Sequence, residues 1–279
     1  MIKLNEVSYT YNGQKKPALD KISLNIEKGE FIGIIGGCGA GKSTLTYTMN
    51  GIIPHHFKGD FYGEAIINGN DTFETDFSDL SRVIGSVLQD IDSQIVTSVV
   101  EDEILFGLEN FDVPKDEIEE RLENALEMVG ISDLRERKIS TLSGGQKQKT
   151  AIASIIALRP NILILDEPTG ELDPASSVQV FEILKKLNTD YGMTIVVVEQ
   201  KIALLCEYAK KLAVMNKGKI VCFDKVHKVL GNTDILKQTG INCPRIVTLS
   251  GILAERGITN GETAVSPKDG EKFVRRVLA

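Results

Sequence analysis

One stretch of the chain decides the fold, and it reads Gly36-Gly37-Cys38-Gly39-Ala40-Gly41-Lys42-Ser43-Thr44. It fits the pattern G-x-x-x-x-G-K-[ST] in full, which is the pattern of a phosphate-binding loop. The preceding segment Phe31–Ile35 is short and wholly apolar, as a buried strand is, and Ser43–Met49 begins a helix. A strand, a glycine loop and a helix in this order indicate a phosphate loop rather than a chance glycine turn.

This loop predicts contacts to a nucleotide and its metal ion. The backbone N–H groups of Gly39 to Ser43, at a helix N-terminus, are suited to cradle phosphate oxygens. Lys42 supplies a point charge to the β- and γ-phosphates, and the Ser43 hydroxyl is expected to ligate Mg²⁺. The predicted cofactors are therefore ATP and Mg²⁺, and the candidate ATP-binding residues of the loop are Gly36, Gly37, Cys38, Gly39, Ala40, Gly41, Lys42, Ser43 and Thr44.

A second apolar run, Ile162–Leu165, ends in the carboxylates of Asp166 and Glu167. A fully apolar strand of this length is typical of a parallel sheet that is covered on both faces. Acidic pairs at strand ends are commonly solvated, but this pair ends a buried strand downstream of the phosphate loop. We expect Asp166 to hold Mg²⁺ through water and Glu167 to polarise the attacking water as the catalytic base.

Between these two motifs stands the run Leu142-Ser143-Gly144-Gly145-Gln146. In this position it resembles the signature of the ATP-binding cassette (ABC) ATPases. The glycines permit close backbone approach to a γ-phosphate, and Ser143 also suits an ordinary helix N-cap. The resemblance implies that this helix start acts on ATP bound by a second subunit, so that two ATP molecules lie between subunits in a head-to-tail dimer.

Three further residues, Tyr11, Gln89 and Asp173, are assigned by the resemblance. Tyr11 matches the aromatic residue that stacks on adenine, and Gln89 matches the glutamine that contacts Mg²⁺ and water and reports to a transmembrane partner. Asp173 matches the aspartate that couples the two sites, and it also suits the N-terminal region of a helix. Gln94 is interpreted as an exposed loop residue without a catalytic role.

The chain departs from the family at Gln200, which stands where a histidine is expected after the strand Thr194–Val198. Glutamine donates one amide hydrogen bond to a γ-phosphate oxygen but never becomes cationic. We therefore expect ATP binding to survive and hydrolysis to continue at a lower rate. A degenerate site that pairs with a different, competent subunit is the alternative.

The resemblance implies an α/β fold: a P-loop NTPase (RecA-like) ABC ATPase core with an antiparallel β subdomain, an α-helical signature subdomain and a small helical C-terminal extension. The predicted ATPase domain is 1–230, with the helical subdomain at about 90–155, and the predicted extension is 231–279. The spacing of apolar residues predicts the following strands and helices: strands at Ile2–Tyr9 and Ala18–Ile26, helices at Lys115–Val129, Gly144–Leu158, Ser176–Leu187, Arg245–Glu255 and Pro267–Leu278, and a hairpin of Leu212–Met215 with Lys219–Phe223.

The tail resembles the ATPase component of energy-coupling factor (ECF) transporters. The residues that carry this resemblance are Leu236–Gly240, Cys243–Arg245 and Leu253–Gly257, together with the loop Ile53–Asp60. It implies a subunit that powers an importer of a micronutrient, a vitamin or cobalt or nickel. The implied partners are a second ABC ATPase subunit, a transmembrane coupling subunit received by Ile91–Val100, and a substrate-binding membrane protein.

The bulk properties agree with a peripheral subunit at the cytoplasmic face of a membrane. The chain has 279 residues, 42% hydrophobic and 25% charged, with a net charge of −7, which argues against a nucleic-acid footprint. No apolar run approaches the roughly 18 residues of a membrane span. Cysteine spacing predicts neither a zinc site nor a disulfide, and His55-His56 is interpreted as part of a polar loop rather than a metal site.

A soluble ABC protein that acts on chromosomes, repair or translation is one alternative. Repair-type ABC proteins insert a long coiled coil between the phosphate loop and the signature, for which this chain has no room, and translation-type members usually carry two cassettes. A regulatory cassette with weak hydrolysis stays open because of Gln200.

Overall fold

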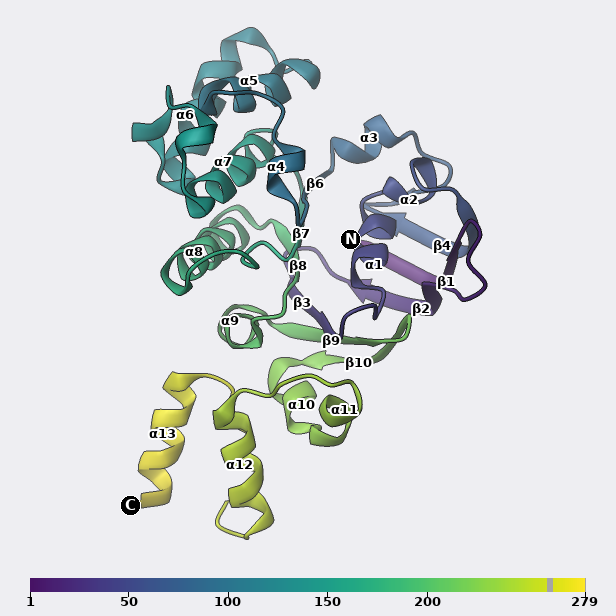
Figure 1. Ribbon diagram of the computed structural model, residues 1–279, viewed down its shortest axis with the longest axis vertical. Helices are drawn as coiled ribbons and strands as arrows, with labels where there is room; N and C mark the ends of the chain where they lie inside the picture. The colour runs from purple at the N-terminus through teal and green to yellow at the C-terminus, as the bar shows by residue number, and fades with distance from the viewer. Residues whose placement is uncertain (260–262, 279) are drawn as a thin grey trace.

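The computed structural model describes residues 1–259 and 263–278, so positions 260–262 and 279 of the predicted extension lie outside the described residues. Its centre is a six-stranded sheet in the order β10-β9-β3-β8-β7-β6 (Figure 1). All of these strands are parallel except β10, which pairs antiparallel with β9. Their bounds are β3 (Phe31–Gly36), β6 (Ile84–Val87), β7 (Ile162–Asp166), β8 (Thr194–Val198), β9 (Lys211–Asn216) and β10 (Lys219–Lys225).

A second, antiparallel sheet has the order β2-β1-β4-β5. Its strands are β1 (Ile2–Tyr11), β2 (Leu19–Ile26), β4 (Gly59–Ile67) and β5 (Asn70–Asp71). The sequence predicted the first two, and β1 continues two residues further than expected. It missed β4 and β5, because glycines and charged residues break the alternation in this stretch.

The parallel sheet separates two apolar cores, because successive side chains of a strand point to opposite faces. Ile32 and Ile34 of β3 face the antiparallel sheet and helix α1 (Lys42–Met49), whereas Phe31 and Ile35 face the helices on the other side. In β7 and β8 every residue is buried. The buried strands predicted at Ile162–Leu165 and Thr194–Val198 are therefore confirmed, and the sheet is covered on both faces there.

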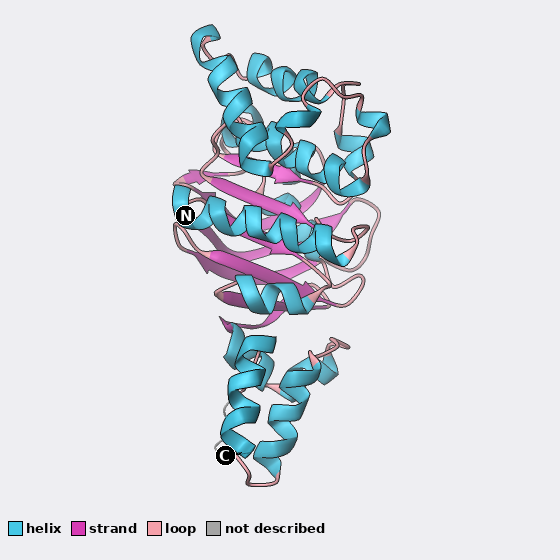
Figure 2. Ribbon diagram, turned by 90° about the vertical axis from the view of Figure 1, so that its left-hand side faces the viewer, coloured by secondary structure: helices cyan, strands magenta, loops and turns pink. Residues whose placement is uncertain are grey.

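Helices cover the face of the parallel sheet that points away from the antiparallel sheet, and further helices extend beyond its edges. Figure 2 shows one group above the sheets and another below them. The predicted helix Lys115–Val129 is confirmed with the same bounds, and the helix predicted at Ser176 begins two residues earlier, at Pro174. The helices on this side and around the antiparallel sheet are α2 (Ile52–His55), α3 (Phe77–Ser81), α4 (Ile91–Gln94), α5 (Val100–Asn110), α6 (Lys115–Val129), α7 (Gly144–Ile156), α8 (Pro174–Tyr191) and α9 (Ile202–Tyr208), with the short 3₁₀ turns Ser132–Leu134 and Ile139–Thr141.

Among the described residues, four helices follow β10, at the foot of Figure 1. They are α10 (Val226–Gly231), α11 (Thr233–Gln238), α12 (Arg245–Glu255) and α13 (Pro267–Leu278), of which the last two were predicted with these bounds. Leu236 and Val247 belong to the same apolar cluster as the helices that cover the parallel sheet. The helices after residue 230 therefore pack against the same apolar core, and the domain boundary at residue 230 stays a prediction. Among the described helices, none combines the length and apolar character that a membrane crossing requires.

Candidate functional site

The glycine loop joins the carboxyl end of β3 to helix α1. Gly41, the residue before the helix, has φ 97°, and a methyl group placed on it would lie 2.5 Å from the carbonyl oxygen of Ala18. Only glycine fits such a backbone without strain. Lys42 Nζ donates to the carbonyl oxygens of Gly36 at 3.1 Å and Gly37 at 3.2 Å, so its ammonium group lies inside the curve of the loop.

A cavity of about 680 Å³ opens in front of this loop. The hairpin turn after β9 forms part of its wall, and Gly218 N donates to the carbonyl of Ala40 at 3.0 Å. Lys16 and Lys217 also line the cavity, and sequence reasoning missed both because charge alone does not distinguish them from other surface lysines. The cavity combines a phosphate loop with additional positive charge, which suits a nucleoside triphosphate.

Tyr11 lies beside the phosphate loop. Its hydroxyl is within hydrogen-bonding distance of Thr44 Oγ1, at 3.2 Å, and its ring packs edge-on against Tyr9 and Phe57. Phe57 in turn stacks on Tyr47 at 5.3 Å between ring centroids. An aromatic cluster therefore stands next to the loop, of which the sequence predicted only Tyr11.

Asp166 ends β7 as a buried carboxylate, 4% exposed. Burial raises its pKa, whereas a hydrogen bond from Ser43 and the charge of Lys42 act in the opposite direction. Oδ1 is buried without a hydrogen-bond partner in the described structure. A buried carboxylate oxygen without a partner, next to a serine hydroxyl, is a donor set that suits Mg²⁺. Asp166 and Ser43 therefore fit the predicted Mg²⁺ site.

Glu167 follows with a positive φ of 51°, an uncommon backbone conformation that recurs at active sites. Its Oε1 accepts a hydrogen bond from Gln200 Nε2 at 2.8 Å, and its Oε2 accepts one from Gln89 Nε2 at 3.3 Å. The three predicted catalytic residues therefore meet at the carboxyl edge of the parallel sheet. They come from the ends of β6, β7 and β8, which is where open α/β sheets place their ligands.

The signature run starts helix α7 with a capping box. Ser143 Oγ accepts from Gln146 N at 3.3 Å, and Gln146 Oε1 accepts from Ser143 N at 2.9 Å. Leu142 and Gly144 line a cavity of about 490 Å³ that also includes Gln89 and Glu167. None of the signature residues lines the cavity at the phosphate loop. The structure therefore separates the signature from the chain's own loop, and Gly145 and Gln146 stand at the helix start.

Asp173 caps helix α8. Its Oδ1 accepts from the backbone N–H groups of Ala175 at 2.9 Å and Ser176 at 3.0 Å, and its Oδ2 accepts from the Ser176 hydroxyl at 2.5 Å. These bonds, led by the Ser176 hydroxyl, lower the pKa of Asp173. The helix-capping role that the sequence suggested is present. The coupling role remains a proposal.

The interpretation of Gln94 as an exposed loop residue is wrong. It ends the short helix α4, is partly buried, and its amide is paired on both sides. Oε1 accepts from Leu88 N at 2.9 Å, and Nε2 donates to the carbonyl of Ser86 at 2.9 Å. Gln94 therefore fixes the backbone at the end of β6, directly before Gln89. Asp92 of the same helix pairs with Lys147 of α7 at 2.7 Å.

The histidine pair belongs to the packing around α2. His55 Nε2 lies 2.8 Å from the carbonyl of Thr72, and both His55 and His56 contact the ring of Phe77. Within residues 1–259 and 263–278, no group of three acidic, histidine or cysteine side chains is arranged to hold a metal.

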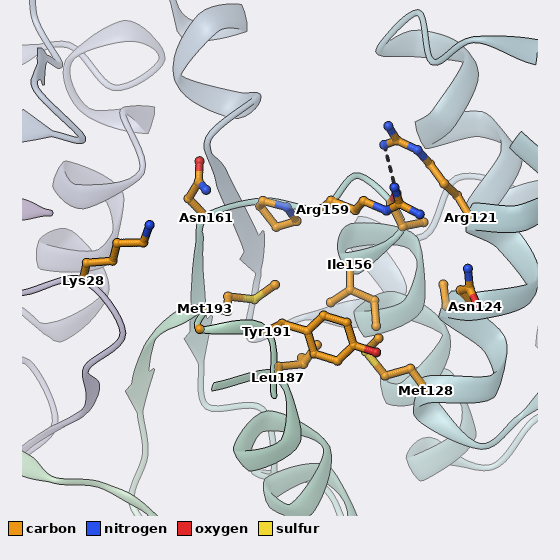
Figure 3. A pocket seen from close by; sticks show the side chains of 14 residues that line it. Lys28, Arg121, Asn124, Met128, Ile156, Arg159, Asn161, Leu187, Tyr191 and Met193 are labelled. Atoms are coloured by element: carbon orange, nitrogen blue, oxygen red, sulfur yellow. Dashed lines mark hydrogen bonds between the residues drawn. The ribbon is translucent and has the colours of Figure 1, made fainter. Parts of the chain in front are cut away.

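A separate cavity of about 480 Å³ lies at the opposite edge of the parallel sheet, where β3, β7 and β8 begin (Figure 3). Its walls come from α6, the end of α7 and the end of α8. The guanidinium of Arg121 donates to Glu117 at 2.6 Å, and Arg159 pairs with Glu120 at 3.0 Å. Its arginines are therefore engaged within the chain, and none of the predicted site residues lines it.

Comparison with known proteins agrees with this geometry. The family model described as ABC transporter matches residues 19–170, which is more than half of the chain. The chain belongs to the ABC transporter ATP-binding family. The cassette is accordingly an ATP-binding ATPase, and its fold is that of the ABC ATPases.

Relatives match the cassette over most of its length. A protein of Pyrococcus horikoshii whose name places it among the ABC transporter ATP-binding proteins is 40% identical over 96% of this chain and 94% of its own length. A longer protein of Treponema denticola with the same kind of name is 44% identical, and the cassette spans 45% of it.

Solved structures give the same fold. CbiO1 of Clostridium perfringens, described as part of the ABC transporter complex CbiONQ, has a TM-score of 0.76 and 32% identity over 91% of this chain and 98% of that protein. A dimeric ATP-binding cassette in a post-hydrolysis state with ADP and phosphate has a TM-score of 0.71 and 29% identity, over 81% of this chain and 99% of that one.

Proposed function

We propose that this cassette is one of two ATPase subunits that power an ECF-type membrane importer, with a vitamin or a cobalt or nickel species as cargo. The observation that supports the proposal is the fraction of this chain that each similar solved structure covers. The dimeric cassette covers 81% of this chain, whereas CbiO1 covers 91%, more than residues 1–230 alone supply. The likeness to a subunit of a named transporter complex therefore includes part of the predicted extension.

The site supports ATP hydrolysis with a Glu167 base. Gln200 and Gln89 orient the carboxylate of Glu167 through its two oxygens, so that it accepts the proton of an attacking water. Lys42 neutralises the charge that develops on the phosphates, and the loop N–H groups orient them. Asp166 and Ser43 would hold Mg²⁺, which supplies Lewis-acid polarisation of the phosphate oxygens when bound.

The separation of the signature from the loop supports a head-to-tail dimer. A helix start with free N–H groups binds an anion, and no such group reaches this chain's own phosphate-loop cavity from α7. Ser143 to Gly145 would therefore clamp the γ-phosphate held by Lys42 of a second cassette. Closure with ATP and opening after hydrolysis then form a population shift between two dimer states.

The surface between α4 and α5 supports a membrane partner at the cytoplasmic face. Val96, two residues after Gln94, is 66% exposed, and Phe106 of α5 is 44% exposed. Movement of a partner on this surface would reach Gln89 through the short helix α4. We assign the surface of Ile95, Val96 and Phe106 to the transmembrane coupling subunit.

The test is capture of tagged cassette from detergent-solubilised membranes of its own organism, with mass spectrometry of the integral proteins that remain bound. We expect a transmembrane coupling subunit, a small substrate-binding membrane protein and a second cassette. Val96→Asp should release the membrane proteins, whereas Val221→Asp, at an exposed valine on β10, should not. Capture of soluble proteins alone would overturn the transport role, and absence of turnover in every cassette pairing would favour a regulatory cassette.

A further inference from the structure

We propose that Lys201 is a positioning residue for hydrolysis, which ties Gln200 to residues 169–177 and through them to the signature of the same chain. Residues 169–177, called here the coupling segment, lie between β7 and the first turn of α8. The inference rests on the proposed function, because it assigns Lys201 a part in communication between two ATP sites of a dimer.

The ammonium group of Lys201 is fully engaged by the coupling segment. Nζ donates to the carbonyl oxygen of Thr169 at 2.6 Å, to that of Leu172 at 2.9 Å and to Ser177 Oγ at 3.0 Å. A lysine has three N–H donors, and all three are used here. Hydrogen bonds from a charged donor are stronger than neutral ones, so this lysine fixes both ends of a loop that carries Asp173.

Glu199 holds the same segment from the other side of Gln200. It is 2% exposed, and its Oε2 accepts from Thr169 Oγ1 at 2.6 Å. Its Oε1 accepts from the backbone N–H groups of Gln200 at 2.8 Å and Lys201 at 3.1 Å. Glu199 and Lys201, the two neighbours of Gln200, therefore both form hydrogen bonds with the coupling segment. A displacement of the Gln200 backbone must move that segment or break these bonds.

The far side of the coupling segment touches the signature glycines. A methyl group placed on Gly145 would lie 2.9 Å from Ser176 Oγ, and one on Gly144 would lie 3.5 Å from Leu172 Cδ2. The start of α7 therefore rests on the segment that Lys201 holds. Contacts run without a gap from Glu167 through Gln200 and Lys201 to the helix start that serves the other ATP.

Lys201 is not part of the nucleotide pocket. The cavity at the phosphate loop is lined by residues 16–18, 20, 39–44, 217 and 218, and Lys201 is not among them. A variant of Lys201 should consequently keep its affinity for ATP while losing the alignment of catalytic groups. A misplacement of catalytic groups by about 1 Å costs on the order of 100-fold in rate.

The experiment compares ATP binding and ATP hydrolysis in the full chain. Lys201→Met removes the three bonds and keeps much of the volume, Lys201→Arg keeps a charged donor, and Lys3→Met is the control at an exposed lysine of β1. We expect Lys201→Met to lower kcat at least about tenfold. Its Kd for a non-hydrolysable ATP analogue should stay within about twofold, and its Hill coefficient should fall toward one.

A second readout reports on the signature directly. Backbone amides of residues 144–146 should exchange with deuterium faster in Lys201→Met than in the wild type, while those of the buried strand β8 keep their protection. Lys201→Arg should restore most of the rate and the cooperativity. Ser177→Ala, which removes one acceptor of three, should give a smaller loss than Lys201→Met.

Equal kcat and equal cooperativity in Lys201→Met and Lys3→Met would overturn the inference. So would a parallel loss of ATP affinity and melting temperature that Lys201→Arg fails to restore, because that pattern indicates general support of the fold. The proposed function fails differently: wild-type chain and partner cassette would then show no turnover above Lys42→Ala. Turnover of Lys201→Met at the wild-type rate overturns only the role of Lys201.

Discussion

Gln200 Nε2 donates a 2.8 Å hydrogen bond to Glu167 Oε1, across the carboxyl ends of two adjacent strands. The sequence predicted a bond from Gln200 to a γ-phosphate, whereas the structure shows its amide on the carboxylate of the base. Because Gln89 holds the other oxygen, the position and direction of this carboxylate depend on two glutamines. A neutral amide in place of histidine is therefore compatible with an ordered base.

The first prediction concerns this bond. Gln200→Ala should lower kcat about 10- to 100-fold with little change in ATP affinity, because the base loses its orientation but the phosphate loop is intact. Gln200→Glu should be worse, since a second carboxylate would face Glu167. Steady-state hydrolysis and equilibrium binding of a non-hydrolysable analogue separate the two quantities. Equal rates for Gln200→Ala and the wild type would refute the positioning.

The second prediction concerns the base itself. Glu167→Gln should bind ATP, stop turning it over and accumulate as a closed dimer, because the amide cannot accept the proton of the attacking water. Light scattering after size-exclusion chromatography, with and without ATP, measures the dimer. Lys42→Ala in the same background is the control, which should stay monomeric. Turnover of Glu167→Gln at the wild-type rate would contradict the assignment of the base.

Local motifs made the centre of the fold predictable. The glycine loop requires a glycine with positive φ at position 41 and a lysine at position 42. Because these two residues are adjacent in the sequence, a local motif is enough to predict the loop. The capping box of Ser143 and Gln146 is local in the same way. The buried strands β7 and β8 were also clear, because a strand buried on both faces lacks the polar alternation of a surface strand.

Contacts between distant segments were not predictable from the sequence. Gln94 looks like a surface residue until β6 brings the backbone of Ser86 and Leu88 to its amide. Lys201 likewise gains its role only when β7 and β8 pair and bring Thr169 beside it. The ring of Phe57 contacts that of Tyr11 only because the antiparallel sheet brings the two segments together. No spacing pattern in the sequence predicts that contact.

The third prediction concerns the aromatic cluster. Tyr11→Ala should weaken ATP binding about tenfold or more, since stacking of a base on an aromatic ring contributes about 1–3 kcal/mol. Tyr11→Phe keeps the ring and loses only the contact between the hydroxyl and Thr44, so we expect a change of about twofold at most. Isothermal titration with an ATP analogue measures both. An equal loss in the two variants would assign the effect to the hydroxyl.

The fourth prediction uses the buried carboxyl of Asp166. Burial raises its pKa, so the folded chain keeps this proton to a higher pH than the unfolded chain does. The charged carboxylate therefore destabilises the fold at neutral pH, and this cost disappears as the pH falls toward the ordinary aspartate pKa of about 3.9. Asp166→Asn should be more stable than the wild type at pH 8 by about 1 kcal/mol, the scale of one poorly satisfied buried group.

Thermal unfolding in a chelating buffer at several values from pH 8 down to about pH 3.5, just below the ordinary aspartate pKa, measures this difference. The difference should stay constant at high pH and disappear as the pH falls through the raised pKa of Asp166 toward about 3.9, and Mg²⁺ with ATP should stabilise the wild type more than Asp166→Asn. Asp173→Asn is the matched control, because hydrogen bonds led by the Ser176 hydroxyl lower the pKa of Asp173 and its charge favours the fold. That control should gain no stability at pH 8. A stability gain for Asp166→Asn that does not change with pH would mean that packing, rather than the buried charge, is responsible.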